Sequence, residues 1–339
     1  MNVLMTGAGA PGGPGIIKCL QTNNQLNLIV CDINEQASGR FLNNAFFVGK
    51  SANDPDFLEF MLEKCQTLKI DVLFPLVTKE LFIFSKHKKL FSQIGTKVIV
   101  SEFESLNIAN NKGLLHIHLS KHNLPTPNYQ IAKTIEEVES AFDSLGFPNK
   151  KICIKPTISN GSRGVRIIDP SADEYNLLFN EKPNSLYIGK EKLLEILKGH
   201  TFPELLIAEF LPGEEFTVDT LVENGILKLV IPRLRTKLNG GISVAGEILK
   251  NEEIIEQVKK ISASLKLNGP IGYQFKKDDN GAFKILEMNP RIQGTSVSLM
   301  GAGVNLPLLA VEQELGIKTV IPDVKWGTKF VRYYNEIYY

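Results

Sequence analysis

The sequence lacks the features that mark several protein classes. Its four cysteines are scattered and form no C-x-x-C pair, so we expect small core residues in a reducing cytoplasm. The 38 lysines and arginines nearly balance the 37 acidic residues, which gives no reason to expect a nucleic-acid or membrane partner. No apolar run approaches a membrane span, and no basic stretch with an apolar core opens the chain.

Several catalytic signatures are also missing. The phosphate-binding pattern G-x-x-x-x-G-K-[ST] is absent, and the sequence shows no Ser-His-Asp or Cys-His arrangement for nucleophilic catalysis. His118 and His122 have the i, i+4 spacing of a metal pair, but no third ligand accompanies them, which favours an exposed helix face. What remains is a chain of 339 residues, 43% of them hydrophobic, which predicts two or three globular domains.

The first hundred residues alternate between apolar strand-like runs and helical segments. This alternation predicts a parallel, doubly wound α/β domain. Pro75 and Thr78 follow an apolar run, at the strand end where open α/β sheets bind ligands. The expected strands cover residues 3–5, 28–31, 72–76 and 97–100.

A glycine-rich turn follows the first expected strand. Residues 7–12 match G-x-G-x-x-G, and Asp32 stands where an acid would hold a ribose hydroxyl, so the pattern is typical of NAD binding. A glycine turn is equally a simple joint between any strand and helix. Pro11 and Pro14 remove N–H donors from a loop that would have to hold phosphate.

After Ser101 the pattern changes to hairpins and longer helices, which predicts an α+β second half. We expect one helix from Leu106 to His122 and a strand over 150–156. The polar glycine loop 159–164 lies between two expected strands rather than before a helix. Further helices are expected over about 251–267 and 307–315.

The stretch from Gly272 to Arg291 carries the strongest chemical signal. An Asp-Asn-Gly turn predicts a hairpin, which could place Gln274 across from Glu287, while Glu287 and Asn289 share one face. Three oxygen donors on one face suit Mg²⁺, and Arg291 could hold a phosphate. The alternative is an edge hairpin with a solvated polar face.

Four motifs in order resemble those of the ATP-grasp superfamily, and most closely its branch that includes the large subunit of carbamoyl phosphate synthase. They are Asn111-Lys112, Lys155 with the loop 159–164, the hinge AEFLPGEEFTVD, and Gln274 with Glu287-x-Asn289-Pro-Arg291. The resemblance implies a Rossmann-like pre-ATP-grasp domain over 1–105 and an ATP-grasp domain over 106–312. Its lid lobe would cover about 120–205, and a tail over 313–339 would close the domain.

The resemblance also implies roles for individual residues. ATP phosphates would be bound by Lys112 and Lys155 and covered by the glycine loop. The hinge would read the adenine, Glu215 would hold the ribose, and one or two Mg²⁺ (or Mn²⁺) ions would be bound. The implied nucleotide-binding residues are Lys112, Lys155, Ser159, Gly161, Ser162, Gly164, Glu209, Phe210, Leu211 and Glu215, and the implied metal ligands are Gln274, Glu287 and Asn289. Gln274 replaces the carboxylate of many relatives, which removes one negative charge.

Arg291 and Lys155 are the expected catalytic residues, together with Arg233. Arg233, Arg235 and the NGGIS loop would form a wall beside the substrate, because arginine suits a carboxylate or acyl phosphate; a solvated strand face is the alternative for them. The aromatic C-terminal segment fits either a strand that closes the domain or a homodimer contact.

The motifs together predict an ATP-dependent, ADP-forming carboxylate–amine ligase acting on small molecules. With one ATP-grasp half and no repeat, a single carboxylate activation is expected rather than carbamoyl phosphate synthesis. Three alternatives remain open: a carbamoyl-phosphate-synthase-type, carboxylase-type or kinase-like ATP-grasp enzyme, a non-catalytic nucleotide-binding module, and an NAD-dependent oxidoreductase. In the ligase interpretation the glycine turn is a joint between strand and helix, and Asp32 is an ordinary strand-end acid.

Overall fold

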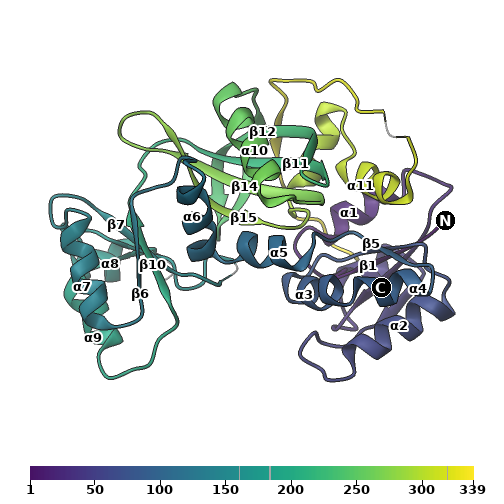
Figure 1. Ribbon diagram of the computed structural model, residues 1–339, viewed down its shortest axis with the longest axis horizontal. Helices are drawn as coiled ribbons and strands as arrows, with labels where there is room; N and C mark the ends of the chain where they lie inside the picture. Colours follow the sequence, from purple (N-terminus) through teal and green to yellow (C-terminus); the bar gives the residue numbers. More distant parts are fainter. Residues whose placement is uncertain (160, 183–184, 319) are drawn as a thin grey trace.

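The computed structural model contains three β-sheets arranged along its long axis (Figure 1). It describes residues 1–159, 161–182, 185–318 and 320–339. The sheet at the right of Figure 1 comes from the N-terminal hundred residues, the sheet at the left forms a separate lobe, and the third lies between them. Over the described residues, no helix combines the length and apolarity needed to cross a membrane.

The first sheet is parallel throughout, with the order β3-β2-β1-β4-β5. Its central strand is completely buried from Val3 to Met5, as a parallel strand covered on both faces must be. The expected doubly wound α/β domain is therefore confirmed. Its elements are β1 (Asn2–Thr6), α1 (Gly13–Leu20), β2 (Asn27–Asp32), η1 (Ser38–Phe41), β3 (Phe46–Val48), α2 (Phe57–Thr67), β4 (Val72–Phe74), α3 (Thr78–Lys86), α4 (Lys88–Gln93) and β5 (Lys97–Val98).

The second sheet has the order β6-β10-β7-β8-β9 and forms the lobe at the left of Figure 1. Its first helix begins at a capping box: the Thr134 side chain accepts the backbone N–H of Glu137, and the Glu137 side chain accepts the backbone N–H of Thr134. The elements are β6 (Tyr129–Ala132), α7 (Ile135–Ser144), β7 (Ile152–Pro156), β8 (Arg166–Ile168), α8 (Glu174–Asn180), β9 (Tyr187–Ile188), α9 (Lys190–Leu197) and β10 (Leu205–Glu209).

The third sheet has the order β15-β14-β11-β12-β13-β16 and is antiparallel. One core of buried residues joins it to the first sheet, since Met5 and Ile17 belong to the same cluster as Leu221 and Ile231. The remaining elements are α5 (Phe103–Asn110), α6 (Lys112–Lys121), β11 (Glu215–Glu223), β12 (Ile226–Asn239), β13 (Ile242–Ile248), α10 (Glu252–Leu265), β14 (Gly269–Lys277), β15 (Phe283–Asn289), η2 (Ser296–Ala302), α11 (Leu306–Leu315) and β16 (Lys329–Val331).

The single helix expected from Leu106 to His122 is wrong. Asn111 adopts an extended conformation, which ends α5 and begins α6, and its side chain accepts the N–H of Leu114 at 3.0 Å. Asparagine competes with the helix for backbone hydrogen bonds, so it favours such a cap. After this break α6 begins with Lys112, whose backbone N–H donates to the carbonyl of Thr157, the residue that follows β7 of the second sheet.

The aromatic C-terminal segment contributes a strand. Residues Lys329–Val331 form β16, which pairs with β13 at the edge of the third sheet. The chain then returns to the N-terminal part of the molecule, where Tyr339 stacks on Phe41 with ring centroids 4.0 Å apart. The strand interpretation of this segment is thus confirmed for these three residues.

The N-terminal glycine turn is a packing joint. A Cβ atom on Gly12 would lie 2.1 Å from the Cα of Gly294, in the loop that follows β15. Within the turn, the N–H groups of Ala8, Ala10 and Gly13 donate to backbone carbonyls, and Gly9 N–H donates to Asp32 at 2.7 Å. The N–H groups that would have to bind a pyrophosphate are therefore already used in hydrogen bonds within the chain.

We predict that Gly12→Ala lowers the free energy of unfolding by about 1–3 kcal/mol, because the added methyl group overlaps the backbone at Gly294. Urea unfolding followed by circular dichroism measures this change. Gly49→Ala is the matched control, since its Cβ would have no neighbour nearer than 3.8 Å and should change stability by less than about 0.5 kcal/mol. Equal stability of the two variants would contradict the joint.

Glu80 in the first turn of α3 is a buried acid that accepts the Thr6 hydroxyl at 2.5 Å. Burial raises its pKa from 4.5 to about 7, with a smaller contribution from Asp32. The folded state therefore holds a proton that the unfolded chain releases at lower pH. Stability due to this group is present below about pH 4.5 and is lost as pH rises through about 7.

We expect Glu80→Gln to remove this pH dependence. The stability difference between wild type and variant should shift by on the order of 2–3 kcal/mol between pH 4.5 and pH 7.5, to the disadvantage of wild type at the higher pH. Urea titrations across that range measure it. Glu59→Gln, an exposed site on α2, should keep the wild-type slope; if Glu80→Gln also keeps it, the assignment is wrong.

Candidate active site

The three predicted metal ligands lie with Arg233 on one face of the third sheet. In the strand register Glu287 is opposite Gln274, Gln274 is opposite Thr217, and Thr217 is opposite Arg233, so these four form one row across the sheet. Asn289 shares the face of Glu287, two residues further along β15. The opposite face is apolar, with Tyr273 in the core beneath α10. The hairpin and its pairing are as the sequence predicts.

Two lysines approach this face from other elements. Lys112, at the start of α6, lies 3.3 Å from Glu287 Oε2 and donates to Ser159 O at 2.9 Å. Lys155, on β7, donates from Nζ to Leu286 O at 2.9 Å. Both side chains are buried, and burial together with Lys155 lowers the pKa of Lys112 while Glu287 opposes that shift. The geometry thus brings Lys112, Lys155 and Glu287 together.

His116 is a site residue that the sequence analysis overlooked. It lies one turn after Lys112 on α6, is 1% exposed, and its Nδ1 has no hydrogen-bond partner within the part of the chain that the structure describes. Burial lowers its pKa to about 3, and the Lys155 and Lys112 charges add to this. The i, i+4 spacing from Lys112 was the available signal. Its neutral imidazole leaves the lysines as the positive charges here.

His118 and His122 each use one ring nitrogen in a hydrogen bond within the chain. Nε2 of His118 lies 3.1 Å from Ser264 Oγ, and Nδ1 of His122 lies 2.8 Å from His118 O. Among the described residues, no cluster of three or more histidine, cysteine or acidic side chains could hold a metal ion.

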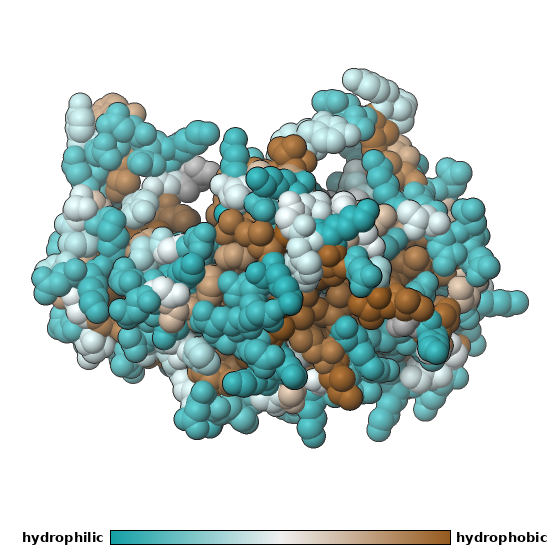
Figure 2. Space-filling view, turned by 90° about the horizontal axis from the view of Figure 1, so that it is seen from above, coloured by the Kyte–Doolittle hydropathy of each residue, from teal (hydrophilic) through white to brown (hydrophobic). Residues whose placement is uncertain are grey.

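The glycine loop connects β7 to β8, as predicted. Asn160 lies outside the described residues, while Gly161, Ser162 and Gly164 all have positive φ angles. A Cβ on Gly241, at the tip of the β12–β13 hairpin, would lie 2.5 Å from Ser162 Oγ. The loop therefore reaches across from the second sheet to the hairpin of the third. Figure 2 shows the surface hollowed between the left lobe and the rest of the molecule.

The predicted hinge joins β10 to β11. Glu209 is held by Asn128, whose backbone N–H and side-chain amide donate to its carboxylate at 2.9 and 3.1 Å. Phe210 follows, with Lys276 Nζ 5.2 Å from its ring centroid, and Leu211 is buried. Glu215 begins β11 and accepts a hydrogen bond from Arg235 Nη1.

Arg291 joins this site to the first sheet. Its Nε donates to Thr78 Oγ1 at 3.0 Å, and its Nη1 donates to Ile292 O at 2.8 Å. Burial lowers the pKa of its guanidinium, while Glu287 opposes that shift. Thr78 is the first residue of α3, so the carboxyl ends of the first sheet meet the polar face of the third.

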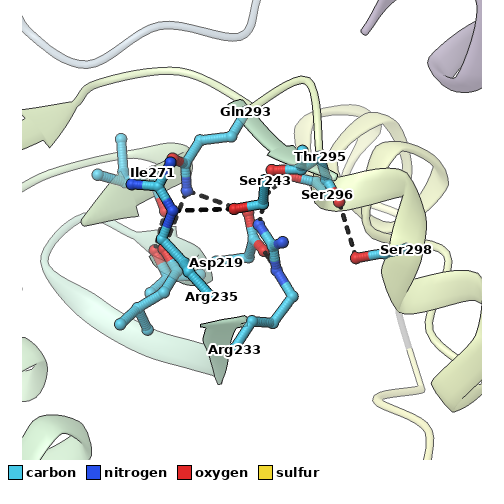
Figure 3. Close-up of polar contacts among 11 residues, drawn as sticks. Asp219, Arg233, Arg235, Ser243, Ile271, Gln293, Thr295, Ser296 and Ser298 are labelled. Atoms are coloured by element: carbon cyan, nitrogen blue, oxygen red, sulfur yellow. Dashed lines mark hydrogen bonds and ion pairs between the residues drawn. The ribbon is translucent and has the colours of Figure 1, made fainter. Parts of the chain in front are cut away.

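Arg233 lies within a buried polar cluster rather than on a solvated strand face (Figure 3). Its Nε donates to Asp219 at 2.6 Å, its Nη2 donates to Thr295 at 3.0 Å, and the Phe330 ring lies 5.8 Å from its Cζ. Its Nη1 has no hydrogen-bond partner among the residues the structure describes. Asp219 also accepts hydrogen bonds from Ser296 and Gln293.

Two protein-family models match parts of the chain. Residues 201–334 match the model described as ATP-grasp in the biosynthetic pathway with Ter operon. Residues 3–99 match the model of the PylC-like N-terminal domain. The chain therefore contains a segment that matches an ATP-grasp domain and, before it, one that matches a PylC-like N-terminal domain. The expected superfamily and fold are confirmed.

The chain is similar to a known enzyme subunit and to several solved structures. It is 27% identical over 239 residues to the carbamoyl phosphate synthase large chain of Caldanaerobacter subterraneus subsp. tengcongensis, covering 66% of the chain but only 20% of that relative. An N5-carboxyaminoimidazole ribonucleotide synthetase in complex with ADP superposes with a TM-score of 0.71 at 14% identity, covering 97% of this chain and 80% of that one.

The biotin carboxylase domain of the Hydrogenobacter thermophilus 2-oxoglutarate carboxylase has the same fold. That structure, a dimer with MgADP, ADP and bicarbonate, matches with a TM-score of 0.71 at 17% identity, covering 97% of this chain and 73% of that one. The low identities mean that these structures show the fold alone.

We predict that Asp219→Ala lowers the free energy of unfolding by about 3–5 kcal/mol, because Arg233 would keep its charge in a buried site without a partner. Replacing both residues, as Asp219→Ala with Arg233→Met, should recover part of that loss. Urea unfolding of the two single variants and the double variant gives the coupling energy. Additive effects would show that the pair is not coupled.

Proposed function

We propose that the protein is an ATP-dependent ligase that activates a small carboxylate. The carboxylate oxygen attacks the γ-phosphorus of ATP, the bond from that phosphorus to the bridging oxygen breaks, and ADP leaves. An amine or another nucleophile then attacks the acyl carbon and displaces inorganic phosphate. The chain spans about one fifth of the carbamoyl phosphate synthase relative, so the proposal is one carboxylate activation rather than that whole enzyme's reaction.

The convergence of Lys112, Lys155 and Glu287 carries this proposal. Two buried ammonium groups beside one carboxylate suit a polyanion, because they offset phosphate charge where little water does so. Without a polyanion, these lysines donate to Ser159 O and Leu286 O. Exchange of such backbone partners for phosphate oxygens requires only side-chain movement.

The donor set beside the lysines fits Mg²⁺ or Mn²⁺. Glu287 supplies one carboxylate, and neither the Gln274 nor the Asn289 side chain has a hydrogen-bond partner within the described ranges. The Lys112 ammonium lies 3.3 Å from Glu287, where it takes the place of a cation. Gln274, Glu287 and Asn289 would hold the ion through oxygen atoms, and when bound it would neutralise charge on the transferring phosphoryl group.

We assign the remaining nucleotide contacts by position. Ser159, Gly161, Ser162 and Gly164 would cover the phosphates, with the positive-φ residues bringing the backbone close. Glu209, Phe210 and Leu211 would contact the adenine, supported by a Leu211 N–H that has no partner among the described residues. Glu215 would exchange Arg235 for the ribose hydroxyls.

On the substrate side we assign Arg291 and Arg233. Arg291 lies at the junction of the two sheets and would bind the carboxylate and its acyl phosphate. Arg233 would offer its Nη1, which has no hydrogen-bond partner among the described residues, to the same groups, with Asp219 fixing its direction.

We propose that the N-terminal domain spans residues 1–105 and the ATP-grasp domain residues 106–312, with residues 313–339 as a tail that closes the domain. Exposed Tyr333, Tyr334 and Tyr338 support a homodimer, which sedimentation would test.

The glycine turn supplies the argument against an NAD-dependent oxidoreductase. Its N–H groups and Asp32 are paired with one another and with the chain around them, so a pyrophosphate would have to break those bonds.

We predict that Glu287→Ala and Lys155→Ala each lower the rate of ADP formation at least about 100-fold, since each removes charge stabilisation at the transferring phosphoryl group. Purified protein is incubated with Mg-ATP and a panel of carboxylates, with and without amines, and ADP is measured by a coupled assay. Circular dichroism checks the fold.

Lys228→Met is the matched control for this assay, because Lys228 forms a surface ion pair with Glu223 and should leave the rate unchanged. Wild-type turnover in both site variants would refute the proposal. A nicotinamide absorbance change that survives Glu287→Ala would point to the oxidoreductase instead.

A further inference from the structure

A cavity of about 240 Å³ opens in the N-terminal sheet, outside the ATP-grasp site described above. It lies at the carboxyl ends of the parallel strands, with Thr6 of β1, Asp32 of β2 and Gly49 after β3 in its wall. This is the edge at which open α/β sheets bind ligands. Its floor is apolar, with Phe57 and Met61 of α2.

The cavity wall carries both acidic and basic groups, and Glu80, with a pKa of about 7, is ionised above neutral pH. Glu80 is 6% exposed and is joined to Thr6, while Asp32 accepts N–H groups from Gly9 and Asn34. Lys79 is exposed at the start of α3 and forms no ion pair among the described residues. Lys50, in the loop after β3, also lines the cavity. It forms ion pairs with Asp54 and Asp56, which do not line the cavity.

The acidic and basic groups of the cavity form no ion pairs with each other among the described residues. Within the described ranges, no ion pair joins Glu80 or Asp32 to either lysine of the lining, and the ion pairs of Lys50 go to Asp54 and Asp56 instead. A ligand with one charge would therefore leave the opposite wall unmatched. A ligand with an ammonium group at one end and a carboxylate at the other would match both walls.

The cavity is also connected to the proposed site of chemistry. Val77 and Lys79 line it, and the residue between them, Thr78, accepts the hydrogen bond from Arg291. A ligand in the cavity therefore lies beside the turn that Arg291 contacts. The volume is below the roughly 300–1,000 Å³ of sites for drug-sized ligands, which suits a molecule the size of an amino acid.

We propose that this cavity binds a free amino acid as a zwitterion, with Glu80 and Asp32 facing the ammonium end and Lys79 facing the carboxylate end. Calling this amino acid a substrate rests on the proposed ligase function, while the binding itself does not. A dinucleotide is excluded as the occupant because the glycine turn has already paired the N–H groups of Ala8, Gly9 and Ala10.

The test is calorimetric titration of the full-length protein with each of the twenty common L-amino acids and their D-forms, without ATP. For any amino acid that binds, the matching amine without a carboxylate and the matching acid without an amine are titrated as well. We expect saturable binding of at least one amino acid, and at least about 10-fold weaker binding of both single-charge analogues.

Three variants locate the site. Glu80→Gln and Lys79→Met should each weaken binding at least about 10-fold, and Gly49→Leu should abolish it, since Gly49 lines the cavity and tolerates a Cβ atom. Glu59→Gln, which removes one acidic charge from the exposed face of α2, is the matched control and should bind normally. Circular dichroism and ATP affinity confirm that each variant is folded.

Two results would overturn the inference: no binding of any amino acid in the panel, or binding that none of the three cavity variants weakens. ADP formation reports separately on the proposed function. Amino-acid binding that Gly49→Leu abolishes, in a protein that never forms ADP, would leave the cavity assignment standing and the ligase proposal refuted. ADP formation that persists without amino-acid binding would do the reverse.

Discussion

Two buried lysines that contact β15, one at a carboxylate and one at a backbone carbonyl, are the constraint on which the centre of this molecule depends. An ammonium group out of water needs oxygen atoms around it, and here those oxygens come from β15 and from the loop after β7. Lys112 of α6 uses Glu287 of β15 and the carbonyl of Ser159, while Lys155 of β7 uses the carbonyl of Leu286. The second sheet, the third sheet and α6 meet where these charges must be satisfied.

The same requirement explains why the polar groups of the proposed site have partners within the chain. Arg235 pairs with Glu215, the tip of the β12–β13 hairpin contacts Ser162, and Asp219 holds Arg233. The partner of Glu215 is one that ligand atoms could replace, whereas Asp219 would stay in place and fix the direction of Arg233. Binding then exchanges one set of hydrogen bonds for another, which costs less than desolvating a free charge.

The first sheet is part of this arrangement and not an independent appendage. A shared apolar core joins it to the third sheet, Gly12 packs on Gly294, and Arg291 donates to Thr78. In the glycine turn that resembles a dinucleotide motif, Gly12 is needed because the backbone at Gly294 packs too closely for a side chain. Its position brings the cavity at the strand ends next to the arginine that the ligase proposal assigns to the carboxylate.

Periodicity and short-range motifs in the sequence were enough to predict the buried strands of the first sheet and the pairing of the β14–β15 hairpin. Buried runs such as Val3–Met5 have only one way to be covered, and the Asp-Asn-Gly turn sets Glu287 opposite Gln274. Asn111 broke an expected helix because a cap competes locally with helix continuation. Only tertiary structure decided that Arg233 is buried with Asp219, that His116 faces two lysines, and that Gly12 meets Gly294. Those contacts join residues distant in sequence or on different elements, and their energies arise from desolvation and packing, which no local pattern records.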